Sequence, residues 1–129
     1  MSDLNTTKKT ILIVEDDSFS QTILDMFLSK KYITVIAENG NEALILLESG
    51  LQPQLIISDL NTPEISGLEL LQILRADQIY SAIPFIVISG DDSDTQQQGC
   101  KQAGANAFVV KPFNPITLGS IIESLLVTS

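Results

Sequence analysis

Five short apolar runs, rich in isoleucine and valine, are spaced along the chain and lack polar residues at alternate positions. The runs are Ile11–Val14, Ile33–Ile36, Leu55–Ile57, Phe85–Ile88 and Ala107–Val110. Strands with this pattern are typical of a parallel sheet that is buried on both faces. Because neighbouring parallel strands need long crossover connections, the pattern also requires helices between the strands.

The segments that connect these runs carry helix signals. Each begins with a polar capping residue, followed three positions later by Glu or Gln, or directly by proline. These pairs are Ser18 with Gln21, Asn39 with Glu42, Ser66 with Glu69, Ser93 with Gln96, and Asn114 with Pro115.

Apolar residues at helical spacing predict the buried faces of these helices. The predicted buried residues are Phe19, Ile23, Met26 and Phe27; Ala43, Leu44 and Leu47; Leu68, Leu71 and Leu74; and Leu118, Ile122 and Leu125. The fourth segment, about residues 94–103, offers only Cys100 and Ala103 for burial.

Five strands alternating with five helices in 129 residues predict one doubly wound α/β domain with a five-stranded parallel sheet. We expect residues 1–9 to form a flexible polar lead-in and residues 10–129 to form the domain. Ligands in such folds bind beyond the carboxyl ends of the strands. We therefore expect the functional site at the carboxyl ends of the predicted strands.

Composition excludes several classes of function. Sixteen acidic residues against seven basic ones give a net charge of −9, which argues against a nucleic-acid or anionic-membrane surface. The chain has no histidine, so a histidine base, metal ligand or phosphocarrier is excluded. The single Cys100 excludes an internal disulfide and a multi-cysteine zinc site. No apolar run approaches the roughly 18 residues of a membrane span, and residues 1–10 lack a secretory core, so we expect a cytoplasmic protein.

Chemically active side chains follow four of the five apolar runs. They are Glu15, Asp16 and Asp17 after the first run, Asp59 after the third, Ser89 after the fourth and Lys111 after the fifth. Each residue alone has an ordinary structural explanation as a cap, a turn or a surface residue. Together they concentrate polar groups on one edge of the sheet.

This combination restricts the chemistry of the edge. Carboxylates held within roughly 4–6 Å repel one another by a few kcal/mol per pair, and a hard divalent cation with oxygen ligands relieves that repulsion. Mg²⁺ prefers one or two carboxylates plus a phosphate oxygen. With Lys111 and Ser89 nearby, the edge suits a transferring phosphoryl group, and a carboxylate there is able to act as its acceptor.

Four segments, in order along the chain, resemble the receiver domains of two-component response regulators. The single-domain chemotaxis regulators are the members that they resemble. The segments are Ile11–Asp17, Ser58–Gly67, Val87–Ser89 and Val110–Phe113. The resemblance covers the chain from about Lys9 to Val127. It implies a flavodoxin-like fold with strand order 2-1-3-4-5.

The resemblance also implies roles for individual residues. Asp59 is the expected phosphoacceptor. Mg²⁺ is the expected cofactor, held by Asp16, Asp59 and the main-chain carbonyl of Asn61, with Glu15 acting mostly through a bound water. Lys111 is expected to bridge to Asp59 and then to the phosphoryl oxygens, and the Lys111–Pro112 peptide is expected to be cis.

Other positions are expected to tune the switch. Ser89 replaces the more usual threonine and is expected to turn its hydroxyl toward the phosphoryl group. Phe108 replaces a frequent tyrosine as the rotating switch ring. In the family, an amide and an acid at the places of Asn61 and Asp91 accompany relatively fast loss of phosphate. We interpret Asp17 as the start of the following loop and not as a metal ligand.

The sequence therefore predicts a signalling switch that accepts a phosphoryl group on Asp59 from a sensor histidine kinase or a histidine phosphotransfer protein. Phosphorylation is expected to change the face formed by the fourth helix, fifth strand and fifth helix, and so to control a downstream protein. The protein is expected to catalyse only its own phosphorylation and dephosphorylation.

Three alternatives remain beside this prediction. An aspartate-nucleophile phosphatase of similar topology typically has a second aspartate two residues after the nucleophile, where this chain has Asn61. A scaffold receiver that works without phosphorylation is disfavoured by the intact set of Asp16, Asp59, Ser89 and Lys111. A flavin-binding protein is weaker still, because the chain has no tryptophan and no glycine-rich phosphate loop after the first run.

Overall fold

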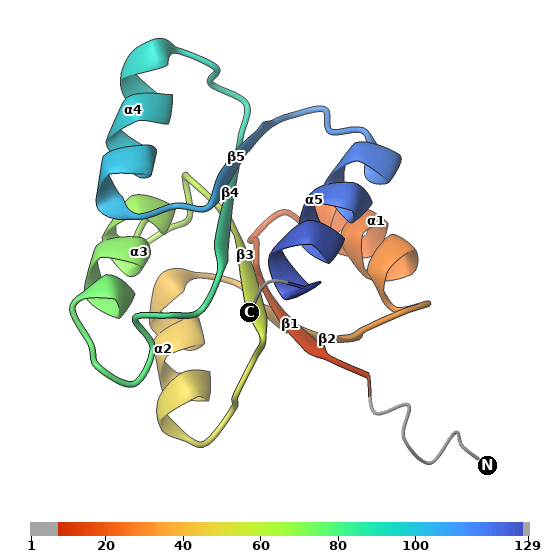
Figure 1. The fold of residues 1–129 in the computed structure, drawn as a ribbon, viewed down its shortest axis with the longest axis horizontal. Coiled ribbons are helices and arrows are strands. Elements are labelled where there is room, and N and C mark those ends of the chain that lie inside the picture. Colours follow the sequence, from red (N-terminus) through yellow and green to blue (C-terminus); the bar gives the residue numbers. More distant parts are fainter. Residues whose placement is uncertain (1–7, 128–129) are drawn as a thin grey trace.

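The computed structural model describes residues 8–127, which contain five parallel strands in one sheet (Figure 1). The strands are β1 (Thr10–Val14), β2 (Ile33–Ala37), β3 (Leu55–Asp59), β4 (Phe85–Ser89) and β5 (Ala107–Val110). Their order in the sheet is β2-β1-β3-β4-β5, so the predicted doubly wound topology is confirmed. Four strands extend one or two residues beyond the predicted apolar runs, because backbone pairing continues past the apolar residues.

Five helices connect the strands and complete the described chain. They are α1 (Ser18–Leu28), α2 (Gly40–Glu48), α3 (Gly67–Arg75), α4 (Asp94–Ala103) and α5 (Pro115–Val127). Within residues 8–127, no helix has the length and apolar character needed to cross a bilayer. Residues 1–7 of the predicted lead-in lie outside the described residues, whereas the carbonyl of Lys9 accepts a hydrogen bond from the Ile33 N–H (2.9 Å).

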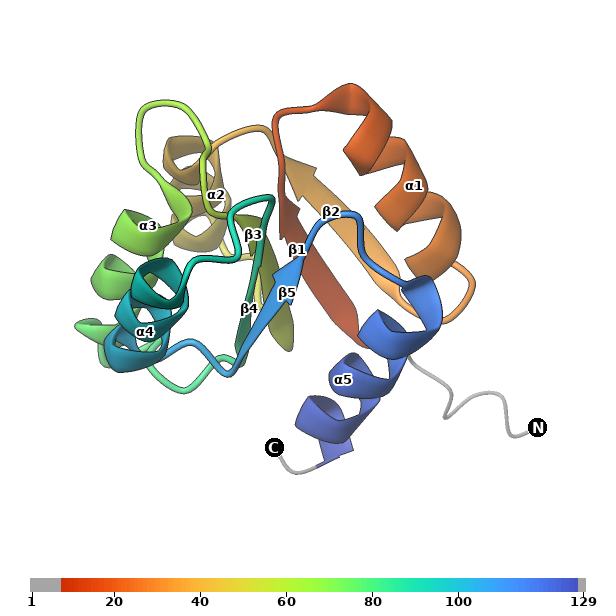
Figure 2. The same cartoon turned by 90° about the horizontal axis from the view of Figure 1, so that it is seen from above.

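The sheet is covered on both faces, as its uninterrupted apolar strands predict (Figures 1 and 2). Helices α2, α3 and α4 cover one face, where Leu12 of β1 and Val87 of β4 are buried. Helices α1 and α5 cover the other face, where Ile13 and Ile88 are buried. Successive side chains of a strand thus enter opposite cores, and each fully buried aliphatic side chain contributes about 1.5–3 kcal/mol.

Most of the predicted helix starts are confirmed. Ser66 and Glu69 form a reciprocal capping box at α3, and Asn39 accepts from the Glu42 N–H at α2. Ser93 caps α4, and Asn114 accepts from two backbone N–H groups in the first turn of α5.

The predicted cap of α1 is wrong by one residue. Asp17 is the N-cap, since its backbone is extended and its carboxylate accepts from the Ser20 N–H at 2.8 Å. Ser18 is the first helical residue. That hydrogen bond also lowers the pKa of Asp17. The Asp17 carboxylate therefore caps α1, and its exclusion from the metal ligands stays a prediction.

The predicted buried face of α1 is only partly correct, since Phe27 packs against the core but Phe19 and Met26 do not. Phe19 and Met26 are 73 % and 64 % exposed, whereas Leu24 and Leu28 are buried against the sheet. Apolar residues occupy more than one side of this helix, so helical spacing alone allows two candidate faces. Packing against the sheet selects the face that carries Leu24 and Leu28.

The β3–α3 loop returns closely over the end of β3. The Gly67 N–H donates to the Leu60 carbonyl at 2.8 Å, and a Cβ on Gly67 would lie 2.4 Å from the Asp59 carbonyl oxygen and 2.9 Å from the Leu60 Cα. Only a residue without a side chain fits this approach. Gly67 therefore fixes the backbone that carries Asp59.

Substitution of Gly67 by alanine tests this constraint. We expect Gly67→Ala to lower the free energy of unfolding by about 1–3 kcal/mol, because the new methyl group meets backbone atoms that have no room to move. Gly99→Ala is the matched control in α4, where a Cβ meets nothing within 4 Å, and it should raise stability by about 0.5–1 kcal/mol. Urea unfolding followed by circular dichroism measures both. A Gly67→Ala protein as stable as the wild type would contradict the expected clash.

Candidate functional site

Glu15 is held in place at the carboxyl end of β1. Its backbone N–H donates to the Ala37 carbonyl at 2.9 Å, and its carbonyl accepts from the Gln21 side chain at 2.6 Å. One carboxylate oxygen accepts from the Asp17 N–H at 3.1 Å. The residue is only 1 % exposed. These contacts fix a buried carboxylate at the edge of the sheet.

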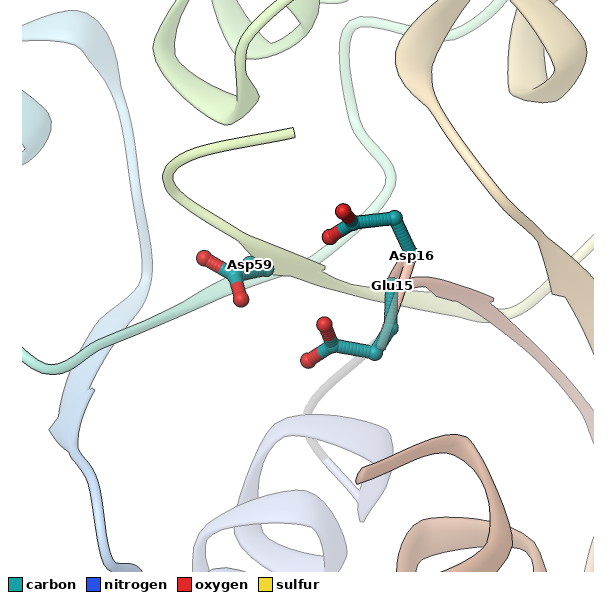
Figure 3. A group of neighbouring side chains, drawn as sticks. All are labelled: Glu15, Asp16 and Asp59. Carbon is teal, nitrogen blue, oxygen red and sulfur yellow. The ribbon is translucent and has the colours of Figure 1, made fainter. Parts of the chain in front are cut away.

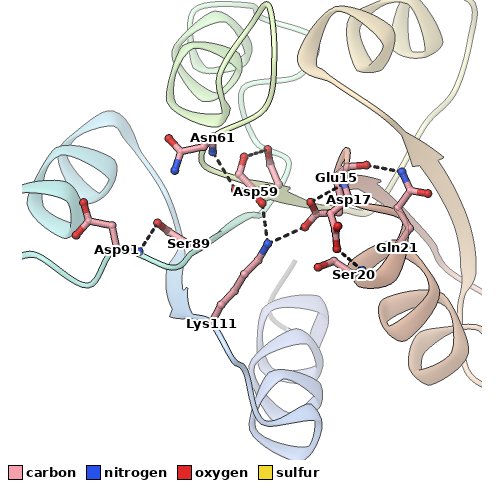
Figure 4. Close-up of polar contacts among 10 residues, drawn as sticks. Glu15, Asp17, Ser20, Gln21, Asp59, Asn61, Ser89, Asp91 and Lys111 are labelled. Carbon is pink, nitrogen blue, oxygen red and sulfur yellow. Dashed lines mark hydrogen bonds and ion pairs between the residues drawn. The ribbon is translucent and has the colours of Figure 1, made fainter.

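Asp59 is the last residue of β3, and both of its carboxylate oxygens are engaged (Figure 4). Oδ1 accepts from the Asn61 N–H at 2.9 Å, and Oδ2 accepts from the Lys111 ammonium at 2.7 Å. Its side chain is 12 % exposed. Asp59 is thus held in one orientation while part of it faces solvent.

Lys111 joins the two carboxylates. It follows β5, and its Nζ lies 3.0 Å from Glu15 Oε1 and 2.7 Å from Asp59 Oδ2. Its backbone N–H donates to the Ser89 carbonyl at 2.8 Å, and the Lys111–Pro112 peptide is cis, as expected. The three residues converge from the ends of β1, β3 and β5, as the strand-end pattern predicts.

The electrostatics of this group reflect burial and pairing. Burial raises the pKa of Glu15 above its ordinary 4.5, although the Asp17 N–H and Lys111 act in the opposite direction. Burial disfavours the charged form of Lys111, but its hydrogen bonds to Asp59 and Glu15 outweigh this effect and raise its pKa above 10.5. The lysine therefore stays protonated, and it offsets part of the repulsion between the carboxylates.

Glu15, Asp16 and Asp59 form a cluster of potential metal ligands (Figure 3). One carboxylate oxygen from each lies within 4.8 Å of the others. Asp16 is exposed, so the cluster is open to solvent on that side. An all-oxygen, anionic donor set of this kind fits a hard divalent cation. The Asn61 carbonyl, also expected to be a ligand, stays a prediction.

The structure places Ser89 and Asp91 next to each other. The buried Ser89 hydroxyl accepts from the Asp91 N–H at 3.0 Å, and the Asp91 carboxylate accepts from the Ser93 N–H at 2.9 Å. In Figure 4 the Asp91 carboxylate points away from Lys111. The roles expected of Ser89 in phosphoryl binding and of Asp91 and Asn61 in phosphate lifetime stay predictions.

Phe108 lies one strand away from Ser89, on β5. It pairs in register with Val87, is half-buried, and contacts the core beneath α2, α3 and α4. With residues of α4, including Gln97 and Lys101, it lines a hollow of about 530 Å³. Its ring is therefore placed between the sheet and α4.

Sequence analysis missed two residues that shape the site. Gln21 was assigned to a helix cap, but its amide donates to the Glu15 carbonyl. Thr62 is 7 % exposed, and its hydroxyl donates to the Ile65 carbonyl at 2.6 Å inside the β3–α3 loop. A polar side chain in a loop has no pattern that reveals such a bond before the loop conformation is known.

Residues 11–123 match the family model of the response regulator receiver domain. This chain belongs to that family. The chemotaxis protein CheY1 of Helicobacter pylori is 35 % identical to this receiver domain over 121 residues, which are 92 % of this chain and 98 % of the relative.

Two solved structures place the receiver domain among similar folds. The chemotaxis response regulator CheY4 of Vibrio cholerae has a TM-score of 0.84 and 29 % identity, covering 92 % of this chain and 99 % of its own. The receiver domain of the sensor histidine kinase PA1611 of Pseudomonas aeruginosa has a TM-score of 0.84 and 25 % identity, covering 92 % and 98 %. That second structure has a magnesium ion coordinated in its active site cleft.

The raised pKa of Glu15 predicts a dependence of stability on pH. When a carboxyl group has a higher pKa in the folded than in the unfolded chain, the protein's free energy of unfolding decreases as pH rises from 4.5 through the folded pKa. The Glu15→Gln variant lacks this pH-dependent decrease. Without divalent ions, its free energy of unfolding minus that of the wild type should therefore be larger near pH 7 than near pH 4. Urea unfolding at both pH values measures the difference.

The exposed Glu48→Gln variant controls for the change in net charge. A stability difference between Glu15→Gln and wild type that is the same at both pH values would contradict the assignment of a penalty to the buried Glu15 carboxylate.

Proposed function

We propose that this receiver domain is a phosphorylation switch in which Asp59 accepts a phosphoryl group from a phosphohistidine. The donor is a sensor histidine kinase or a histidine phosphotransfer protein. The observation that carries the proposal is the position of Asp59, which lies between Lys111 and the Asn61 N–H and beside two further carboxylates. The likeness to chemotaxis response regulators supports it.

The chemistry is one displacement at phosphorus. An Asp59 carboxylate oxygen forms a bond to phosphorus, the bond from phosphorus to the donor imidazole breaks, and the electron pair stays on the imidazole nitrogen. Lys111 keeps its charge next to Asp59 and is placed to bind a phosphoryl oxygen. Loss of the phosphoryl group to water restores the carboxylate.

The proposed cofactor is Mg²⁺. Glu15, Asp16, Asp59 and the main-chain carbonyl of Asn61 would hold it, and when bound it neutralises charge on the transferring phosphoryl oxygens. The carboxylate cluster described above fits this ion on its own chemistry, since all donors are oxygen and the net charge is negative.

A phosphatase that turns over other substrates is the weaker assignment. The residue two positions after Asp59 is Asn61, whose amide N–H is far too weak an acid to serve as a general acid. Its backbone N–H instead orients the Asp59 carboxylate. The proposed activity is therefore limited to phosphorylation and dephosphorylation of the protein itself.

The proposed output surface is the face formed by α4, β5 and α5, which would control a protein partner. When the Ser89 hydroxyl turns toward the phosphoryl group, it must leave the Asp91 N–H at the start of the β4–α4 loop. Helix α4 has only one fully buried residue, Cys100, so its packing is weakly constrained. The Phe108 ring has no hydroxyl to desolvate and is placed to fill the space that Ser89 leaves.

Phosphorylation at Asp59 has a direct test. Incubation with acetyl phosphate or phosphoramidate and Mg²⁺ should add the mass of one phosphoryl group to the wild type, and Asp59→Asn should gain none, because an amide is a poor nucleophile. Asp92→Asn, in the exposed β4–α4 loop, should behave like the wild type. Intact-protein mass spectrometry measures all three. Equal incorporation in wild type and Asp59→Asn would refute the assignment.

Mg²⁺ should stabilise the unphosphorylated protein by relieving repulsion among the three carboxylates. Binding to the folded state alone contributes about 1.4 kcal/mol when the ion is near tenfold above its Kd. Asp16→Asn should weaken this effect and should also be more stable than wild type without Mg²⁺. Thermal melts with and without the ion measure both. A wild-type Tm that millimolar Mg²⁺ leaves unchanged would count against the metal site.

The output surface is tested with beryllofluoride, a phosphoryl mimic. Its addition with Mg²⁺ should change amide hydrogen exchange across residues 91–113, since α4 repacks and the Phe108 ring turns. Asp59→Asn should show no such change and serves as the control. Changes confined to the loops around Glu15 and Asp59 would contradict the proposed switch.

A further inference from the structure

The positive charge of this acidic chain is concentrated at one place. The sequence has six lysines, and four of them line a single hollow of about 600 Å³. These four are Lys8, Lys9, Lys30 and Lys31. They come from the segment before β1 and from the α1–β2 turn, and the end of α5 completes the wall. We call this surface the basic hollow.

The basic hollow has an apolar lining as well as charge. Tyr32, Leu126 and Val127 line it; Val127 is 82 % exposed, whereas Tyr32 and Leu126 are mostly buried and offer only a small part of their surface. The aliphatic stems of lysine side chains extend such an apolar surface while their ammonium groups stay in water. The hollow therefore offers contacts both to an apolar side chain and to anions.

Among residues 8–127, two of the four lysines contact a polar partner within the protein. Lys31 forms an ion pair with Glu123, and the Lys8 ammonium lies 3.4 Å from the Ser29 carbonyl. Four lysines and one glutamate leave the hollow with a net charge of +3, in a chain whose net charge is −9. A ligand complementary to the hollow is anionic, and it must be small enough to avoid the acidic surface elsewhere.

This size limit decides the class of ligand. A membrane or a nucleic-acid duplex extends far beyond the hollow and meets the negative charge on the rest of the surface. A short peptide segment interacts mainly with charges within a Debye length, about 10 Å at 0.1 M salt. An acidic peptide with an apolar side chain matches both the lysines and the lining.

We propose that the basic hollow binds an acidic peptide segment of a partner protein, with carboxylates facing the lysines and an apolar side chain near Tyr32 and Val127. The hollow lies at the amino ends of β1 and β2, whereas Asp59 lies at the carboxyl end of β3. The surface is therefore separate from the proposed phosphorylation site. Its four lysines lie outside the proposed output face of α4, β5 and α5, so its occupancy should not depend on phosphorylation.

Fluorescence anisotropy tests the proposal. The probe is a fluorescein-labelled peptide with glutamates on both sides of one leucine, and its controls carry glutamine for glutamate or serine for leucine. Wild type should bind the parent peptide more tightly than either control peptide. Addition of 1 M salt, which shortens the Debye length to about 3 Å, should weaken binding strongly.

Variants locate the binding. The triple variant Lys8→Gln, Lys9→Gln and Lys30→Gln should weaken binding about tenfold, since three exposed charge contacts are lost. Lys30→Gln alone should weaken binding more than Lys101→Gln, which removes one exposed lysine from α4 outside the hollow. Asp59→Asn and beryllofluoride-treated protein should bind like the wild type.

Other results would overturn the proposal. Equal binding by wild type and the triple variant would place the peptide elsewhere. Tighter binding to single-stranded DNA or to phosphatidylserine vesicles than to the peptide would assign the hollow to a different class of partner. Self-association of the wild type at low salt that the triple variant loses would assign it to a second copy of this chain.

Discussion

The ion pairs of Lys111 with Glu15 and Asp59 are the interaction on which the site depends. The carboxylates of Glu15 and Asp59 have oxygens within 4.8 Å of each other, and Glu15 is almost fully buried. At such a separation two carboxylates repel by a few kcal/mol unless a cation lies between them. In the sheet, β4 separates β5 from β3, so a side chain from the end of β5 must reach across the end of β4. Lysine has the length to do so, and its charge offsets part of the repulsion at the acidic edge.

The sequence predicted the parts of this arrangement that follow from strand geometry. Buried apolar runs gave the five strands, and polar residues directly after them, such as Asp59 and Lys111, met at one edge because parallel strands end on the same side. Prediction failed where a choice depended on tertiary packing. Phe19 and Leu24 are both apolar and both on α1, and Leu24 is the one that packs in the core beneath α1 and α5. The bond between Ser89 and the Asp91 N–H depends on a loop conformation that no spacing rule describes.

The two ends of the parallel sheet differ in the charge of the side chains beside them. The carboxyl ends of the strands carry the acidic cluster, and the amino ends of β1 and β2 lie beside the basic hollow. Between them the two apolar cores fix the strands in register, so the ends are held apart by a rigid layer. Helix α4 has one buried residue, Cys100, whereas α3 buries three leucines, so we propose that repacking is easiest at α4. The fold therefore keeps the proposed phosphorylation site and the lysines of the proposed peptide-binding surface at opposite ends of the sheet.

The central claim is that the Asp59 carboxylate, and no other group, carries the phosphoryl moiety. Borohydride reduces an aspartyl phosphate to homoserine, so treatment of the phosphorylated protein followed by peptide mass spectrometry identifies the residue directly. We predict homoserine at position 59 alone, formed only when phosphodonor and Mg²⁺ are both present. Reduction at Glu15 or Asp16, or a phosphate that resists borohydride and maps to Ser89, would contradict it.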